Sequence, residues 1–198
     1  MEREEKGREA EQEMELAFDL EEWQEGLKLG LSCALQELLE EHDEVYAISL
    51  VLTADLWAVG VQANTKNFLL EQAGSVQNED YLYYKYAEEE WGIDEAAAEI
   101  FEDLTQMLQE CLSENSDLFT DENYDYSEAF QEFRDQILAS SLRVFREFVT
   151  EGEGSRHPEI SWNFYVRELF EAADMLELYR MLNQDETRRK EFASILEL

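Results

Sequence analysis

Hydrophobic residues near the N-terminus recur every three or four positions, which is the spacing of a helix with one buried face. The residues that show it are Leu16, Leu20, Trp23, Leu27, Leu31, Leu35 and Leu38. They predict a long amphipathic helix that ends near Glu41. Gly26 and Gly30 lie within it, and we expect them to allow close packing against a neighbouring element. Residues 1–15 are mostly Glu, Lys and Arg, and we expect this segment to be frayed.

Helical spacing returns in the middle of the chain and near its end. One stretch begins at Asp94, a residue type that caps helices. Another begins at 123–125, where Asp125 and Glu128 have the spacing of a capping box, and continues to Phe148. Two shorter helices are expected over residues 170–182 and 186–196.

Three stretches have the composition or alternation of β-strands. Residues 45–53 are nearly all apolar, as expected for a central strand covered on both faces. After a short turn, Trp57, Val59 and Val61 alternate with smaller or polar residues, so the two stretches predict a hairpin over about 45–62. Residues 160–167 also alternate and should join it. The sequence therefore predicts an α+β fold, in which a small, mostly antiparallel sheet packs against several long amphipathic helices.

Composition predicts a single acidic domain. The chain has 198 residues, of which 44% are hydrophobic, and no linker divides it, so we expect residues 16–198 to form one domain. Asp and Glu number 49 against 15 Lys and Arg, which gives a formal net charge of -34. A field of this sign repels nucleic acid and anionic membranes and attracts basic partners. We therefore expect a basic protein partner, with no direct binding to nucleic acid or membrane; the oligomeric state is open.

The cysteines and the N-terminus bear on cellular location. Cys33 and Cys111 lie among apolar residues of helical stretches, where buried free thiols are expected in preference to a disulfide. Residues 1–15 lack the apolar core of a signal peptide, and no stretch is apolar enough to span a bilayer. We therefore expect a soluble protein in the cytoplasm.

Motifs of the common enzyme classes are absent from the sequence. It has no nucleophile elbow, no phosphate-binding loop and no dinucleotide-binding fingerprint. His42 and His157 are the two histidines, and neither has the spacing of a zinc or di-iron site. We therefore expect no cofactor and can assign no catalytic residue.

One stretch partly matches the calcium loop of an EF-hand. The matching positions are Asp121, Asn123, Asp125, Ser127 and Glu132. The position that needs glycine for the sharp turn is Tyr126. We therefore expect no metal site and interpret the acids as part of a helix N-terminus. Calcium binding by Asp121, Asn123, Asp125 and Glu132 is the alternative.

The region from Asp117 to Glu132 also interleaves acidic and aromatic residues. This mixture is typical of a surface that binds a cationic partner. The alternative is that the aromatic residues fill the core while the acids face water. If the first interpretation holds, the partner contacts are Asp117, Asp121, Glu122, Tyr124, Asp125 and Tyr126.

Several segments resemble a known family. These are Tyr46 to Thr53, Trp57 to Thr65 with its Ala-Asn-Thr ending, Tyr83 to Trp91 and Leu182-Asn183. Together they resemble the uncharacterised bacterial domain-of-unknown-function family 4303. No catalytic residues follow from the resemblance. Small acidic α+β proteins of this kind are similar to immunity proteins that neutralise basic toxins. By that analogy Tyr84 and Trp91 are further partner-contacting residues, although such aromatic residues also commonly fill a core.

The sequence thus predicts a non-catalytic binding protein, of the kind that inhibits a basic, nuclease-like toxin. Two alternatives stay open. One is a nucleic-acid mimic whose carboxylates occupy the groove of a DNA-binding protein. The other is an enzyme with an unfamiliar acidic site.

Overall fold

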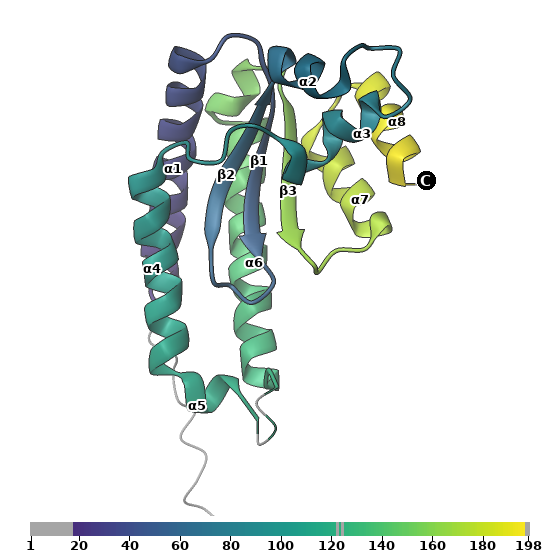
Figure 1. Cartoon of the computed structure of the whole chain (residues 1–198). Helices are drawn as coiled ribbons and strands as arrows, with labels where there is room; N and C mark the ends of the chain where they lie inside the picture. The colour runs from purple at the N-terminus through teal and green to yellow at the C-terminus, as the bar shows by residue number, and fades with distance from the viewer. Residues whose placement is uncertain (1–17, 122, 124, 197–198) are drawn as a thin grey trace, which may run out of the picture.

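The computed structural model describes residues 18–121, 123 and 125–196, in which eight α-helices and a three-stranded sheet make an α+β fold (Figure 1). The expectation that residues 1–15 are frayed lies outside the described residues. The sheet lies in the centre, and long helices cover one of its faces. Within the described residues, no helix is long and apolar enough to cross a membrane.

The strands are β1 (Val45–Thr53), β2 (Val59–Thr65) and β3 (Ser161–Arg167). The longer helices are α1 (Leu20–Glu41), α4 (Ala98–Glu114), α6 (Glu128–Thr150), α7 (Ala172–Leu182) and α8 (Glu186–Leu196). The shorter ones are α2 (Lys66–Ala73), α3 (Tyr81–Tyr86) and α5 (Ser116–Phe119), with the 3-10 turns η1 (Glu88–Glu90) and η2 (Glu153–Arg156).

The sheet has the strand order β2-β1-β3. β1 and β2 form the expected hairpin and pair antiparallel, whereas β1 and β3 pair parallel. The predicted strands are confirmed, but the sheet is mixed and not mostly antiparallel. The residue pattern of a strand does not specify its direction. Here α6 decides it, because α6 returns the chain to the end of the sheet where β1 begins, and β3 starts from there (Figure 1).

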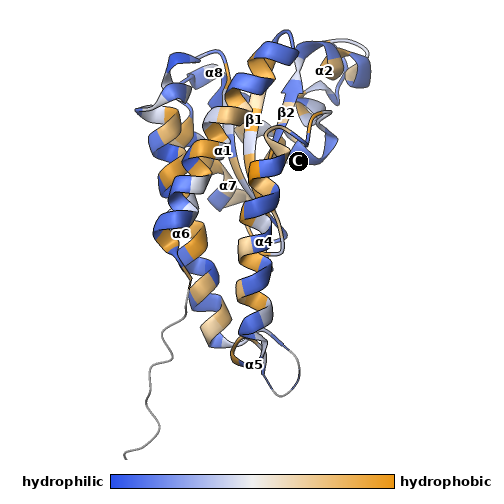
Figure 2. Cartoon of the chain, turned by 90° about the vertical axis from the view of Figure 1, so that its left-hand side faces the viewer, coloured by the Kyte–Doolittle hydropathy of each residue, from blue (hydrophilic) through white to orange (hydrophobic). Residues whose placement is uncertain are grey.

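One face of the sheet packs against α1, α4 and α6 and forms the main core. Alternate residues of each strand point to this face, including Leu50, Val61 and Phe164. Each helix contributes the apolar face that its spacing predicts, and Figure 2 shows hydrophilic and hydrophobic positions interleaved along all three. Because burying apolar surface yields about 25 cal/mol per Å², this core stabilises the fold.

α1 approaches α4 closely at two glycines. A Cβ atom at Gly26 would lie 2.7 Å from Leu104 Cδ2, and one at Gly30 would lie 3.1 Å from Phe101 Cζ. The predicted role of these glycines in close packing is therefore confirmed. Real Cβ contacts are essentially never as short as the one at Gly26, so a larger residue there would displace Leu104.

α4 begins later than the sequence predicts. We expected Asp94 to cap it, but Asp94 is exposed and the helix starts at Ala98. Ala97, the residue before the helix, has a φ of 53° and donates its N–H to Glu37 Oε2 on α1 at 2.9 Å. The prediction was wrong because tertiary contacts hold the chain before Ala98: Ile93 pairs with β2.

α6 also begins later than predicted. Its capping residue is Ser127, whose Oγ accepts the N–H of Phe130 at 3.2 Å. The predicted capping box of Asp125 and Glu128 does not form, because Asp125 belongs to the preceding loop. There its N–H donates to Asp121 Oδ1 at 3.0 Å.

A short segment crosses the second face of the sheet, and we call residues 88–93 the strap. Glu88 accepts a hydrogen bond from Asn163 Nδ2 on β3 at 2.8 Å. Trp91 packs beside β1 in a small cluster of its own, and the backbone of Ile93 pairs with Ala63 at the edge of β2. The strap therefore runs across the sheet from β3 to β2, in front of its upper part in Figure 1.

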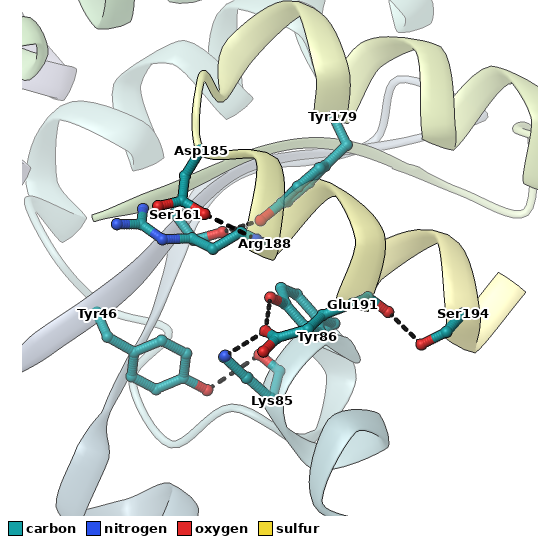
Figure 3. Close-up of polar contacts among 9 residues, drawn as sticks. All are labelled: Tyr46, Lys85, Tyr86, Ser161, Tyr179, Asp185, Arg188, Glu191 and Ser194. Carbon is teal, nitrogen blue, oxygen red and sulfur yellow. Dashed lines mark hydrogen bonds and ion pairs between the residues drawn. The ribbon is translucent and has the colours of Figure 1, made fainter. Parts of the chain in front are cut away.

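The C-terminal helices form a third cluster beside β3. Tyr86, Tyr179 and Phe192 pack together there, with the Tyr179 and Phe192 rings stacked 4.1 Å apart. In Figure 3, Glu191 of α8 accepts hydrogen bonds from Lys85 Nζ at 2.6 Å and from the Tyr86 hydroxyl at 2.7 Å. These contacts hold α8 against α3.

Both cysteines are free, as the sequence predicts. Cys111 is buried in the main core, while Cys33 is half-buried. Burial and the nearby charge of Glu114 raise the pKa of the Cys111 thiol to about 11.

Candidate functional site

The predicted partner-contacting acids lie at one end of the molecule, on α5 and the loop before α6 (Figure 1). Asp117, Asp121 and Asp125 are all exposed there. Tyr126 is 53% exposed and stacks on Phe130, with ring centroids 4.0 Å apart. The structure therefore brings four of the predicted residues together. Glu122 and Tyr124 lie outside the described residues.

Asp121 organises this loop. Its Oδ1 accepts the backbone N–H of Asn123 at 2.7 Å and that of Asp125 at 3.0 Å. These hydrogen bonds stabilise the ionised carboxylate and hold its pKa below the ordinary value. The ends of the loop also pair, in an isolated bridge between Thr120 and Tyr126. The acids are thus presented on a closed loop.

Two of the residues named in the calcium alternative have other structural roles, and calcium binding stays an untested alternative. The described residues contain no group of three or more His, Cys, Asp or Glu side chains arranged to hold a metal ion. Asp121 Oδ1 is already an acceptor for two amides, and Glu132 lies on α6 beyond its cap. His157 contacts Glu159, with Nδ1 and Oε1 3.2 Å apart.

Tyr84 and Trp91 lie in a different region. Trp91 is 8% exposed and packs with Tyr46, Ala47 and Leu69, while Tyr84 is half-buried against the same cluster. The structure does not bring these two side chains together with the acidic loop. Their contact with a partner stays a prediction.

Trp57 is an exposed aromatic residue that sequence reasoning missed. The alternation placed it in the second strand beside Val59 and Val61, but β2 begins at Val59 and Trp57 lies in the turn, 53% exposed. The Trp57 N–H donates to Thr53 Oγ1 at 2.9 Å, and its carbonyl accepts from Gln109 Nε2 on α4 at 2.9 Å. These bonds hold the turn against α4.

The turn and the acidic loop lie near each other. Partial burial, followed by the charge of Asp55 in the turn, raises the pKa of the Tyr126 hydroxyl. In Figure 1 the turn between β1 and β2 points toward the end of the molecule where α5 and the loop before α6 lie. The sequence does contain a signal that Trp57 lies in a turn. Asp55 comes two residues before Trp57, and Asp is a residue type that favours turns.

Acidic residues dominate the sequence around this loop. From Tyr86 to Phe133 the sequence has no lysine, arginine or histidine. The exposed acids of α4 are Glu99, Glu102, Asp103, Glu110 and Glu114. The ion pairs among the described residues all involve acids outside this stretch. We call the exposed acids of α4 with Asp117, Asp121, Asp125, Trp57 and Tyr126 the acidic surface.

Glu88 on the strap is a carboxyl group of a different kind. It is 3% exposed, and burial raises its pKa to about 7, against the opposing effect of the hydrogen bond from Asn163. Glu191, by contrast, is partly exposed. Burial opposes its ionisation, but the hydrogen bonds from Lys85 and Tyr86 outweigh this and lower its pKa.

Residues that carry the family resemblance have structural roles. Asn183 Oδ1 accepts the N–H of Trp162 at 2.8 Å, and Asn183 Nδ2 donates to the Trp162 carbonyl at 2.7 Å. The Asn183 side chain thus pairs with the backbone of β3 as the backbone of a neighbouring strand would. Asn64 Nδ2 donates to the Tyr46 hydroxyl at 3.1 Å, and Thr65 caps α2.

Comparison with protein families shows which family the chain belongs to. Residues 27–184 match the family described as Domain of unknown function (DUF4303), and the chain belongs to this family. The comparisons with curated proteins and with solved structures gave no match.

Proposed function

We propose that this member of the DUF4303 family is a non-catalytic protein that binds a basic protein through its acidic surface, as an immunity-type inhibitor binds a basic toxin in the bacterial cytoplasm. The observation that carries the proposal is the stretch from Tyr86 to Phe133, which holds no basic residue and whose exposed acids on α4 and in the loop before α6 are accompanied by the exposed side chains of Trp57 and Tyr126.

Charge and aromatic residues have separate parts in such an interface. Uncompensated carboxylates steer a basic partner and increase its association rate, and this effect weakens with salt. Tyr and Trp side chains supply most of the affinity where they become desolvated, often about 2 kcal/mol or more each. Trp57 and Tyr126 fit this part because each is about half exposed before binding.

Affinity capture followed by calorimetry tests the proposal. The full chain is used to capture proteins from native lysate of its source organism, and the captured basic protein is then titrated at low and high salt. We expect affinity to fall as salt rises. A second titration in the presence of duplex DNA distinguishes a nucleic-acid mimic, because DNA then competes for the same site on the partner.

Two pairs of charge reversals assign the surface. Glu114→Lys with Asp117→Lys changes the acidic surface, while Glu71→Lys with Glu79→Lys makes the same change in charge at the opposite end, on and after α2. We expect the first pair to weaken partner binding by at least about tenfold and the second by less than about twofold. Equal losses from both pairs would mean that net charge alone, and not this surface, determines binding.

A further inference from the structure

A groove with a volume of about 520 Å³ lies between α6 and α7, at the edge of the sheet formed by β3. Leu138 and Leu142 line it from α6, one helical turn apart, and Leu178 and Met181 line it in the same way from α7. Phe164 of β3 also lines it. Sites for small molecules are usually clefts of about 300–1,000 Å³, lined mainly by apolar and aromatic side chains. The groove has the size and the lining of such a site.

The apolar side chains of the groove are accessible. Leu142 and Phe170 are only partly buried against the main core, and Met181 is 37% exposed. The Phe170 ring lies 6.3 Å from that of the buried Phe164, so the floor of the groove continues into the core. Apolar side chains left together at a surface often mark a binding site. Phenyl rings and the methionine sulfur both favour contact with an aromatic ring, so we expect a ligand with an aromatic body.

Charged side chains at the rim of the groove select the polar group of the ligand. Asp135, Asp174 and Glu177 line the groove and are exposed. Arg134 lines it too, but its Nη2 lies 3.4 Å from Asp135 Oδ1 and is therefore already paired. Asp174 Oδ2 accepts the N–H of Glu171 at 3.4 Å in the cap of α7.

Glu177 is therefore the carboxylate best placed to meet a ligand. Within the part of the chain that the structure describes, it takes part in no ion pair. An ammonium group suits it, because that group is a compact cation with N–H donors and no acceptor.

We propose that this groove binds a small aromatic amine, whose ring packs between α6 and α7 and whose ammonium group lies against the Glu177 carboxylate. The groove is separate from the acidic surface, because α7 and α4 lie on opposite sides of the sheet in Figure 1. The two proposals can therefore fail separately.

Calorimetric titration of the full chain with tryptamine tests the proposal, with tryptophol as the matched ligand. Tryptophol has the same indole ring and the same ethyl chain, but a neutral hydroxyl replaces the ammonium group. We expect tryptamine to bind at least about fivefold more tightly than tryptophol. Absence of tryptamine binding at millimolar concentration, or equal binding of the two ligands, would overturn the proposal.

Two substitutions on α6 test whether the ligand occupies the groove. Ala139 is exposed on the groove wall, whereas Gln136 is exposed on the same helix and does not line the groove. We expect Ala139→Phe to fill the groove and weaken tryptamine binding at least about tenfold, and Gln136→Phe to change it less than about twofold. Circular dichroism checks that both variants are folded. Unchanged binding by folded Ala139→Phe, or equal losses from both variants, would contradict the proposed site.

Met181→Ala provides an independent variant if phenylalanine at position 139 prevents folding. It removes an apolar side chain from the groove wall without adding bulk. Weaker binding of both tryptamine and tryptophol supports the proposal, because the two ligands share the ring that packs there. Unchanged binding of both contradicts it.

A pair of neutralised carboxylates separates local from overall charge, since a chain with a formal net charge of -34 attracts any amine. Glu177→Gln changes the groove, while Glu147→Gln makes the same change at an exposed position of α6 outside the groove. We expect Glu177→Gln to weaken tryptamine binding about threefold and to leave tryptophol binding unchanged. Glu147→Gln should alter neither. Equal effects of the two variants on tryptamine would overturn the contact with Glu177.

Sedimentation equilibrium tests whether a second copy of the chain fills the groove. We expect the wild type and Ala139→Phe to sediment as the same species. A wild-type dimer that Ala139→Phe dissociates would assign the groove to the second copy and overturn the proposal.

Discussion

The two faces of the sheet differ sharply in chemistry. The face toward α1, α4 and α6 is apolar, with side chains such as Leu50, Val61 and Phe164 in a closely packed core. The face beneath the strap carries Gln62, Ser49 and Asn163 in one row, next to the buried Glu88 carboxyl. Apolar burial stabilises a fold, whereas buried polar atoms without partners oppose folding. The comparison teaches that one side of the sheet supplies the packing that stabilises the fold, while the other side holds polar side chains in the interior.

The largest effect is expected on the apolar face. Phe145 is 0% exposed, and its ring lies 6.2 Å from that of Trp162. Phe145→Ala removes this packing and leaves a cavity, so we expect the free energy of unfolding to fall by about 3–5 kcal/mol. Urea denaturation followed by tryptophan fluorescence measures the change. A loss below about 1 kcal/mol would mean that this face is not the main source of stability.

A substitution on the strap face should increase the free energy of unfolding. Burial raises the pKa of Glu88 from 4.5 to about 7, so the folded chain holds this proton more tightly than the unfolded chain. The contribution of Glu88 to the free energy of unfolding is therefore fully favourable below pH 4.5, and it is lost as the pH rises toward 7. Glu88→Gln removes the buried charge and retains an amide oxygen for Asn163. At pH 8 we expect it to increase the free energy of unfolding by on the order of 3 kcal/mol.

Denaturation over the range from pH 4.5 to 8 tests this sign. The difference in stability between Glu88→Gln and the wild type should grow with pH across the range. Glu89→Gln is the matched control, because Glu89 is exposed beside Glu88. A difference that is constant with pH, or the same for both variants, would contradict a buried Glu88 with a raised pKa.

A smaller loss is expected where β3 lacks a neighbouring strand. Asn183→Ala leaves the N–H and the carbonyl of Trp162 without their side-chain partner. We expect a decrease of about 1–3 kcal/mol in the free energy of unfolding, the usual cost of buried groups left unpaired. Hydrogen exchange should locate the effect at the Trp162 amide. Unchanged protection of that amide would show that the Asn183 contact does not support the strand.

The smallest effect on stability is expected at the acidic surface. Trp57 is 53% exposed, and the hydrogen bonds of its turn involve its backbone, so Trp57→Ala should change the free energy of unfolding by less than about 0.5 kcal/mol. Partner affinity should nevertheless fall by at least about tenfold. Loss of stability without loss of affinity would assign Trp57 to the fold and remove it from the interface.

Local patterns predicted much of the fold. Helical spacing placed Trp23, Leu27 and Leu31 on the buried face of α1, and strand alternation placed Phe164 and Val166 in the core. These predictions succeeded because one face of each element is buried, so burial imposes a regular spacing on the sequence. Starting points of helices were less predictable. Asp94 and Asp125 have the chemistry of capping residues, but Ile93 beside Asp94 pairs with Ala63 of β2, and the N–H of Asp125 donates to Asp121 within the preceding loop.

The candidate site residues also differed in how well the sequence could predict their location. Asp117, Asp121, Asp125 and Tyr126 are close in sequence, so their common location could be predicted. Trp57 was assigned to a strand, since alternation cannot show where a turn ends. Long-range pairing creates the row beneath the strap. Its three members come from three strands, and each is an ordinary polar residue in its own segment.

By itself, the sequence determined the α+β class, the amphipathic helices, the free thiols and the uncompensated acidic stretch, because each depends on local spacing or on composition. Tertiary structure alone decided the parallel pairing of β3, the burial of Glu88 and the alignment of Ser49 with Gln62 and Asn163. These features depend on the direction and register in which distant strands meet, and neither is encoded in the pattern of a single strand.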